Sequence, residues 1–391
     1  KLTEEELEEI EGGLARSAGH CGVMGTASTM TSLAEALGMT LTGCANIPAA
    51  DSRRIAIAEQ SGRRIVAMVH EDLRPSRIMT RQALENAITV DMAIGGSTNA
   101  VVHLLAIAGR LGVPLALDDF DAISRRTPYI ANVKPSGEYL MEDFFYAGGI
   151  PAVMREILSL LHADAFTVTG KTIGENVAAS ECFNRDVIRA ASAPLNPEGG
   201  TIVLRGNLAP DGAVLKQTAA SPQLLDHRGK AYVFANYEAM RSEIDREDLP
   251  VTKDSVLVLK NAGPKGAPGF PEWGHIPLPR ALLKQGIEDV VRVSDARMSG
   301  TSFGTVVLHT APESAVGGPL ALVETGDEIH LNAEARILRL CVDEAELARR
   351  KAAFVESAPK YARGYGRLFL EHVTQANLGC DFDFLHATQR S

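Results

Sequence analysis

The chain has 391 residues, 45% of them hydrophobic and 23% charged, which is enough for two domains of ordinary size that each bury a core. Its formal net charge of −10 argues against nucleic acid or an anionic membrane as the main partner, because phosphate binding needs a basic surface. No apolar run is long enough to span a bilayer. We therefore expect neither nucleic acid nor a membrane to be a partner.

The cysteines predict a reducing environment. There are five of them, an odd number, and none forms a CxxC pair. This pattern fits free thiols better than a disulfide framework and provides no complete cysteine metal site. The sequence also shows no signal peptide at its start, so we expect a cytoplasmic protein. The five are Cys21, Cys44, Cys182, Cys341 and Cys380.

The first stretch of the chain has helical patterns around a small-residue loop. Thr3 and Glu6 have the spacing of a capping box, which predicts a short acidic helix to about Ile10 or Leu14. The loop 17–22 then precedes a second helix that should stop at Gly38. Cys21 therefore lies just before a helix N-terminus, a place that favours the thiolate, the form that binds metal. The alternative is a buried and inert cysteine.

Further helices are expected over residues 51–62 and 75–89, with residues 63–69 either extending the first or forming a short strand. The motif at 95–99, GGSTN, precedes an apolar helix over 100–111. Two glycines before Ser97, Thr98 and Asn99 could form an anion site for a carboxylate or phosphate, or Ser97 or Thr98 could simply cap the helix. We expect His103 to be a core or interface histidine. A short helix is expected to start at 117–120 and to end before Pro128, and others are expected at 141–146 and 150–162.

The composition changes across residues 193–200, APLNPEGG, which is the best boundary signal in the sequence. We therefore divide the chain into a helix-rich α/β domain over 1–195 and a β-rich domain, barrel-like or sandwich-like, over 196–391. Helices return at 343–354 and around 368–372. The β-type runs are 201–204, 213–215, 231–234, 255–259, 290–293, 305–310, 321–323 and 328–331.

Two segments of the β-rich half carry candidate chemistry. The loop 260–274 is dense in glycine and proline, and in it Glu272 is either a salt-bridged surface group or a ligand of a hard metal. The segment 291–305 is a polar turn between two apolar strands, in which we expect Asp295 and Arg297 to pair. A hydrolase that uses Ser299 with a histidine, His309 or His275, lacks the GxSxG motif that would support it.

Taken together, these segments resemble the dihydroxy-acid dehydratase / phosphogluconate dehydratase family. The MGTASTM run after Cys21 is similar to the branch that acts on sugar acids such as L-arabinonate and D-xylonate. The matching motifs, in the family's order, are CGVMGTASTM at 21–30, IPA at 47–49, GGSTN at 95–99, PSG at 135–137, RGNLAP at 205–210, KNAGPKG at 260–266 and SDARMSGT at 294–301.

The resemblance implies an activity and its site. Such enzymes remove water from a 2,3-dihydroxy acid and leave a 2-keto-3-deoxy acid. It implies that Cys21 binds an iron–sulfur cluster, with the 2Fe–2S type favoured over 4Fe–4S, that Glu272 binds Mg²⁺, and that Ser299, as its alkoxide, removes the C2 proton. Thr301 and the helix start at Ser97, Thr98 and Asn99 would orient the substrate. A homodimer or homotetramer is also implied.

The sequence departs from the family in one respect. The family's N-terminal segment, with further cluster cysteines, acidic magnesium ligands and a lysine that becomes carbamylated, has no counterpart here. We therefore expect the chain to be the C-terminal two thirds or so of such an enzyme. By itself it should be inactive, and either cofactor could be absent from it.

Three alternatives remain open at this point. Two are enzymes of the same family, a branched-chain dihydroxy-acid dehydratase and a phosphogluconate dehydratase, which differ in substrate. The third is a cofactor-free binding or assembly module that keeps the fold.

Overall fold

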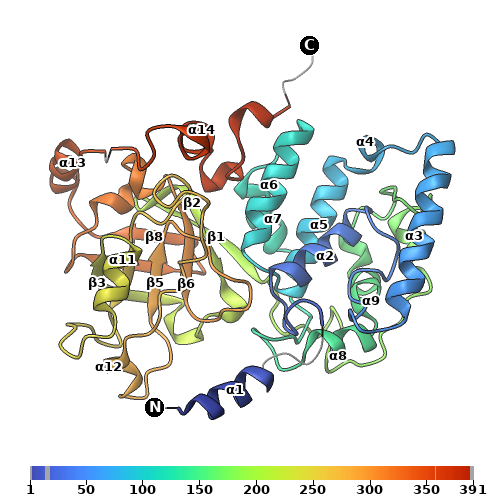
Figure 1. The fold of residues 1–391 in the computed structure, drawn as a ribbon, viewed down its shortest axis with the longest axis horizontal. Coiled ribbons are helices and arrows are strands. Elements are labelled where there is room, and N and C mark those ends of the chain that lie inside the picture. The colour runs from blue at the N-terminus through green and yellow to red at the C-terminus, as the bar shows by residue number, and fades with distance from the viewer. Residues whose placement is uncertain (1, 14–17, 357, 388–391) are drawn as a thin grey trace. The chain divides into compact units, whose positions relative to one another are not determined.

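The computed structural model describes residues 2–13, 18–356 and 358–387, and the chain divides into two units. The first unit comprises residues 1–96 and 126–199 and is built from helices (Figure 1). Its central helix is α5, which is buried along nearly its whole length and packs against α2 and α9. The helices of this unit are α1 (Glu4–Gly13), α2 (Thr26–Ala36), α3 (Arg53–His70), α4 (Pro75–Ile78), α5 (Arg81–Ile94), α8 (Met141–Tyr146), α9 (Gly149–Glu156) and α10 (Ile173–Val177).

Local chemistry explains most of these helix boundaries. The Thr3 hydroxyl accepts a hydrogen bond from the Glu6 N–H, and Glu6 accepts one from the Thr3 N–H, so the capping box is confirmed. Residues 63–69 continue α3. The single helix expected over 75–89 was wrong, because the Thr80 side chain accepts from the Ala83 N–H and starts a separate helix, α5.

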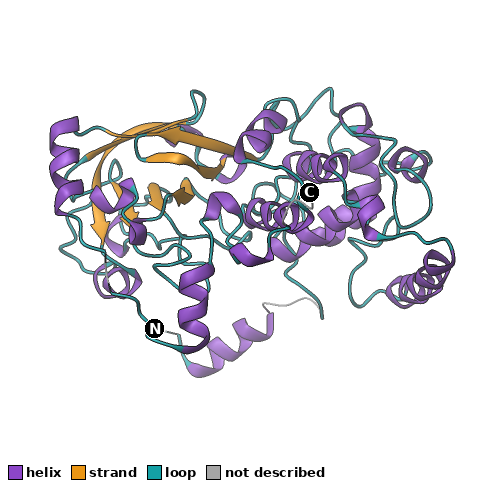
Figure 2. Cartoon of the chain, turned by 90° about the horizontal axis from the view of Figure 1, so that it is seen from above, coloured by secondary structure: helices purple, strands orange, loops and turns teal. Residues whose placement is uncertain are grey.

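The second unit comprises residues 97–125 and 200–391 and contains a closed barrel of β1 to β8, drawn in orange in Figure 2. The fold class expected from the sequence, helices followed by a β-rich barrel, is confirmed. The domain boundary at residue 195 stays a prediction. The strands are β1 (Thr201–Gly206), β2 (Ala209–Lys216), β3 (Asp226–Phe234), β4 (Val256–Leu259), β5 (Val291–Ser294), β6 (Val306–Ala311), β7 (Glu328–Asn332) and β8 (Ile337–Leu340).

The strands follow the order β1-β2-β6-β5-β4-β3-β7-β8 around the barrel. Neighbours from β3 to β6 are parallel, and the other pairs are antiparallel except for a single parallel contact that closes β8 onto β1. Of the expected runs, 321–323 was wrong: it lies at the end of a 3₁₀ turn, Pro319–Leu322, which begins with a proline that cannot donate to a ladder.

Alternating side chains of the barrel strands belong to two apolar clusters. Val256 and Val258 of β4 pack with residues such as Leu338, which together form the larger core. Leu257 and Leu259 belong to a second cluster that includes Met240 and residues of two short helices. Because both faces of β4 are buried, the strand is a continuous apolar run, as parallel strands usually are. The helices of this unit are α6 (Asn99–Leu111), α7 (Leu117–Ser124), α11 (Tyr237–Glu243), α12 (Arg280–Leu283), α13 (Glu344–Ala353) and α14 (Gly364–His372).

Candidate active site

Glu272, Ser299 and Thr301, three of the predicted site residues of the second unit, lie on loops at one end of the barrel. Strands β4, β5 and β6 are parallel neighbours, so the loops that follow them leave from the same edge. Glu272 lies on the loop after β4, and Ser299 lies on the loop after β5. The barrel therefore brings together two motifs that are far apart in the sequence.

Asp295 ties these loops together at their base. One of its carboxylate oxygens accepts the Ala262 N–H at 3.0 Å, and the other accepts the N–H and the hydroxyl of Ser314, at 2.8 and 2.5 Å. The expected pair between Asp295 and Arg297 was wrong, because Asp295 is fully buried among these donors while the Arg297 side chain donates to the carbonyl of Phe270. Burial raises the pKa of the Asp295 carboxyl.

Glu313, which follows β6, holds the loop after β4 in the same way. It accepts hydrogen bonds from the Lys265 and Gly266 N–H groups, each at 2.9 Å, and from the Gln375 side chain at 2.7 Å. Burial raises its pKa to about 7. Gly263 has no room for a Cβ beside it, since Glu313 Oε2 would lie 2.6 Å away. Glu313 was not among the residues predicted from the sequence, although a charged residue directly after a buried strand was a usable signal.

Ser299 is half-buried and is paired with Thr301. The two hydroxyl oxygens are 2.9 Å apart, and the Thr301 N–H lies 3.4 Å from Ser299 Oγ. In the part of the chain that the structure describes, no histidine is hydrogen-bonded to Ser299. His309 is instead buried beside the Phe270 ring, and burial lowers its pKa to about 3. A Ser-His-Asp arrangement therefore has no support here.

Glu272 lies on the exposed side of its loop and is bound by Asn99 of α6. Asn99 Nδ2 donates to Glu272 Oε1 at 2.6 Å and to the Met298 carbonyl at 3.1 Å. The neighbouring Trp273 stacks on Tyr237 with ring centroids 4.1 Å apart, which holds the loop beside Glu272. Three predicted segments, the start of α6, the Glu272 loop and the Ser299 turn, thus meet at Asn99.

The other residues at the start of α6 are buried. Ser97 Oγ accepts the Asn99 N–H at 3.2 Å, and Thr98 precedes the first helical residue without a capping bond from its side chain. His103, further along α6, is half-buried, and its pKa is lowered by burial and by the nearby Arg297. An anion site at this helix start stays a prediction.

Cys21 lies in the first unit, exposed, in the loop before α2. Hydrogen bonds from the Met24 N–H to the Lys134 carbonyl and from the Met141 N–H to the Gly22 carbonyl fix the loop on the C-terminal side of the thiol. All five cysteines are free thiols.

The fit of these residues to metal cofactors is partial. Within residues 2–13, 18–356 and 358–387, no group of three or more His, Cys, Asp or Glu side chains could hold a metal ion. Cys21 offers one thiol and Glu272 one carboxylate, so each can supply a single ligand. A bilayer-spanning helix is likewise not found among the described helices.

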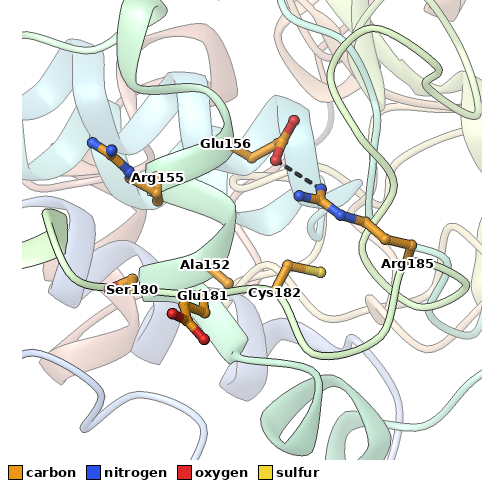
Figure 3. Close-up of a pocket in the computed structure, with 7 residues that line it drawn as sticks. All are labelled: Ala152, Arg155, Glu156, Ser180, Glu181, Cys182 and Arg185. Carbon is orange, nitrogen blue, oxygen red and sulfur yellow. Dashed lines mark hydrogen bonds and ion pairs between the residues drawn. The ribbon is translucent and has the colours of Figure 1, made fainter.

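Two cavities are lined by residues other than those predicted from the sequence. One, of about 580 Å³ in the first unit, is lined by polar side chains including Cys182 and the ion pair of Arg185 with Glu156, whose atoms are 2.7 Å apart (Figure 3). The other, of about 490 Å³ in the second unit, is lined by Lys265 and Trp273 among others. Neither includes Cys21, Ser299 or Glu272 in its lining.

Comparison with known proteins identifies close relatives. Residues 1–176 match the family described as dihydroxy-acid/6-phosphogluconate dehydratase N-terminal, and residues 186–380 match its C-terminal counterpart. An L-arabinonate dehydratase of Rhizobium leguminosarum bv. trifolii is 54% identical over 98% of this chain and 67% of its own length. A 6-deoxy-6-sulfo-D-gluconate dehydratase of Pseudomonas putida is 50% identical over 97% of this chain and 66% of its own. A dihydroxy-acid dehydratase of Ignicoccus hospitalis is 44% identical over 96% and 68%. The chain thus spans about two thirds of the length of these relatives.

Proposed function

The chain belongs to the dihydroxy-acid/6-phosphogluconate dehydratase family, and on that premise we propose that it is part of a sugar-acid dehydratase. The reaction removes water from a 2,3-dihydroxy sugar acid and gives the 2-keto-3-deoxy acid. The observation that carries this proposal is the meeting of the Ser299 turn, Glu272 and Asn99 at one end of the barrel. Relatives named for sugar acids are 50–54% identical to the chain, and those named dihydroxy-acid dehydratase are 42–44% identical.

Ser299 is proposed to accept the C2 proton of the substrate. A serine hydroxyl is a weak acid, so its alkoxide needs stabilising donors. The Thr301 hydroxyl and N–H both face Ser299 Oγ and would donate to the negative oxygen, which favours the ionised form. The substrate itself would be oriented by Thr301 and by Ser97 and Thr98 at the start of α6.

In the whole enzyme, Cys21 would be one ligand of an iron–sulfur cluster, of the 2Fe–2S type, and Glu272 one ligand of Mg²⁺. Bound there, the two groups would supply Lewis-acid chemistry, polarising the C3 hydroxyl and the oxygens around C2. Since the described residues supply one ligand for each, we propose that this chain by itself is inactive.

Assembly and location follow the same proposal. Residues 1–195 would contribute to the cluster-binding domain, and residues 196–391 would form the domain that carries the catalytic serine. The free state of all five cysteines supports a reducing cytoplasm. The whole enzyme would be a homodimer or homotetramer.

The test is made in a full-length enzyme, formed by these residues together with the further third that the relatives carry. It is assayed anaerobically for 2-keto-3-deoxy acid from L-arabinonate, D-xylonate, 6-phosphogluconate and a branched-chain 2,3-dihydroxy acid. We expect turnover of a sugar acid, and Ser299→Ala should lower kcat by at least about 10²-fold, the usual contribution of a positioned base.

Ser302→Ala, in the same turn, is the matched control and should keep most of the activity. If only the branched-chain 2,3-dihydroxy acid were turned over, the assignment of a sugar acid as the substrate would be wrong. Full activity of Ser299→Ala would reject Ser299 as the base. Substrate binding without turnover would favour the binding module.

A further inference from the structure

Asn99 has an unusual set of partners for a residue at a helix start. It is 1% exposed, and its side-chain nitrogen donates to Glu272 Oε1 at 2.6 Å and to the Met298 carbonyl at 3.1 Å. A carboxamide nitrogen carries two hydrogens, so two acceptors at these distances use both of them. Both N–H groups of this amide therefore have acceptors, and the role of Asn99 in orienting the substrate stays a prediction from the sequence.

Asn99 is itself held firmly. Its backbone N–H donates to Ser97 Oγ, and Val102, one turn along α6, packs on Phe270 in a small buried cluster. The amide therefore projects from a fixed helix toward both the Glu272 loop and the Ser299 turn. The bond to Ser97 lies outside both the Glu272 loop and the Ser299 turn, whereas the packing of Val102 on Phe270 joins α6 to the Glu272 loop itself.

The backbones of the loop and the turn have their own connections. The Gly274 N–H donates to the Arg297 carbonyl at 2.9 Å, and the Arg297 side chain donates to the Phe270 carbonyl. These contacts would survive the loss of the Asn99 side chain. Among the described residues, Asn99 alone hydrogen-bonds the Glu272 carboxylate, which lies on an exposed residue and would otherwise sample several rotamers in water.

We propose that Asn99 is a positioning residue, which fixes the Glu272 carboxylate against the turn that carries Ser299. The assignment rests on the proposed function, in which Glu272 and Ser299 act on the same substrate. A reacting group that is misplaced by about 1 Å can lose about 10²-fold in rate, so this orientation bears on turnover more than on substrate binding.

The first experiment needs no activity. Unfolding by urea is measured for the 391-residue chain, for Asn99→Ala, for Glu272→Ala and for the double variant. Asn99→Ala should raise the unfolding equilibrium constant in both backgrounds. The factor of that rise should be at least about threefold smaller in the Glu272→Ala background than in the wild type, because the effects of contacting residues are not additive. If Asn99→Ala changes the unfolding constant by the same factor in both backgrounds, within about twofold, the proposal that Asn99 holds Glu272 is wrong.

Asn86→Ala is the matched control for this cycle. Asn86 is also fully buried and makes two hydrogen bonds, both with the backbone of His162. Neither of these bonds involves Glu272 or Asn99, so its effect should be additive with Glu272→Ala.

The second experiment separates positioning from substrate binding in the full-length enzyme. Asn99→Ala should lower kcat by about 10- to 100-fold and change KM for the sugar acid by less than about threefold. Asn86→Ala should be destabilised and keep its kcat. A rise in KM with unchanged kcat would make Asn99 a substrate ligand and overturn the proposal. If the wild-type enzyme dehydrates no sugar acid, the proposed function fails, whereas the unfolding cycle still decides whether Asn99 holds Glu272.

Discussion

At the scale of single residues, the buried carboxyl group of Glu35 sets a pH dependence of stability. Glu35 lies on α2, fully buried, and accepts the Gly43 and Ala45 N–H groups at 2.7 and 2.9 Å. Burial outweighs these two bonds and raises its pKa to about 7 from 4.5. Between about pH 4.5 and 7 the folded chain therefore holds this proton while the unfolded chain has lost it. As a result, the free energy of unfolding falls as the pH rises through this window.

We predict that Glu35→Gln removes this dependence. The pKa shift corresponds to about 3 kcal/mol of unfolding free energy. The wild type should lose this amount as the pH rises across the window, and the variant should not. The variant gives up one of the two backbone bonds, so it starts from a lower stability at the acidic end of the window. Urea unfolding at several pH values measures both effects, with the exposed Glu9→Gln as the control. Parallel pH profiles for wild type and Glu35→Gln would contradict the prediction.

Glu35 also shows where sequence reasoning stops at this scale. In the sequence it is one charged residue in a helix of small residues, which favours an exposed position. It is buried because a loop eight to ten residues later presents two backbone N–H groups that need an acceptor. Asp295 is buried for the same reason, and no local pattern revealed the burial of either carboxyl group.

At the scale of elements, a buried ion pair fixes strand β5. Arg292 interrupts the apolar strand, 2% exposed, and its guanidinium binds Asp289 at 2.6 Å and the carbonyls of His275 and Ile276. Asp289 in turn accepts the N–H and hydroxyl of Thr305, just before β6. The Asp289 carboxylate thus links the segment that precedes β5 to the residue that precedes β6.

We predict that Asp289→Ala destabilises the barrel strongly. It leaves the Arg292 charge buried and uncompensated, which costs about 3–5 kcal/mol of unfolding free energy. The matched control is Asp248→Ala, which breaks the exposed pair with Arg246, 2.8 Å apart, and should change the unfolding free energy little. Urea unfolding curves of the two variants provide the measurement. If both variants lost similar amounts of unfolding free energy, the pair of Asp289 and Arg292 would not be a buried structural pair.

Elements with a strong local pattern were predicted and the others were missed. Apolar runs located β1, β4 and β6, because strands buried on both faces show little else, and the alternation of Val291 and Val293 located β5. The strand β8 and the helices α11 and α12 were not foreseen, since each is only four to seven residues long and too short to show a period. The helix expected over 75–89 was divided by a cap at Thr80, a choice that the helical pattern on either side did not reveal.

At the scale of the whole molecule, the order of the motifs along the chain was enough to identify the family. The sequence placed Glu272 and Ser299 as separate candidates. Only the parallel pairing of β4, β5 and β6 explains why their loops share one end of the barrel. Register and strand order depend on contacts between distant residues, which a single sequence does not display.

The last prediction concerns the chain as a catalyst on its own. The described residues hold no group of three metal-binding side chains, and the thiol and carboxylate that we assign to cofactors are single ligands. A cluster or a magnesium ion held by one protein ligand should bind weakly, because affinity depends on a complete donor set. We therefore expect the 391-residue chain, incubated anaerobically with iron, sulfide and Mg²⁺, to form no 2-keto-3-deoxy acid from L-arabinonate, while the full-length enzyme treated alike does. Iron and sulfide measured on the desalted chain should be far below one cluster per molecule. Turnover by the chain alone would show that its own residues complete the site, and the assignment of Cys21 and Glu272 as lone ligands would then be wrong.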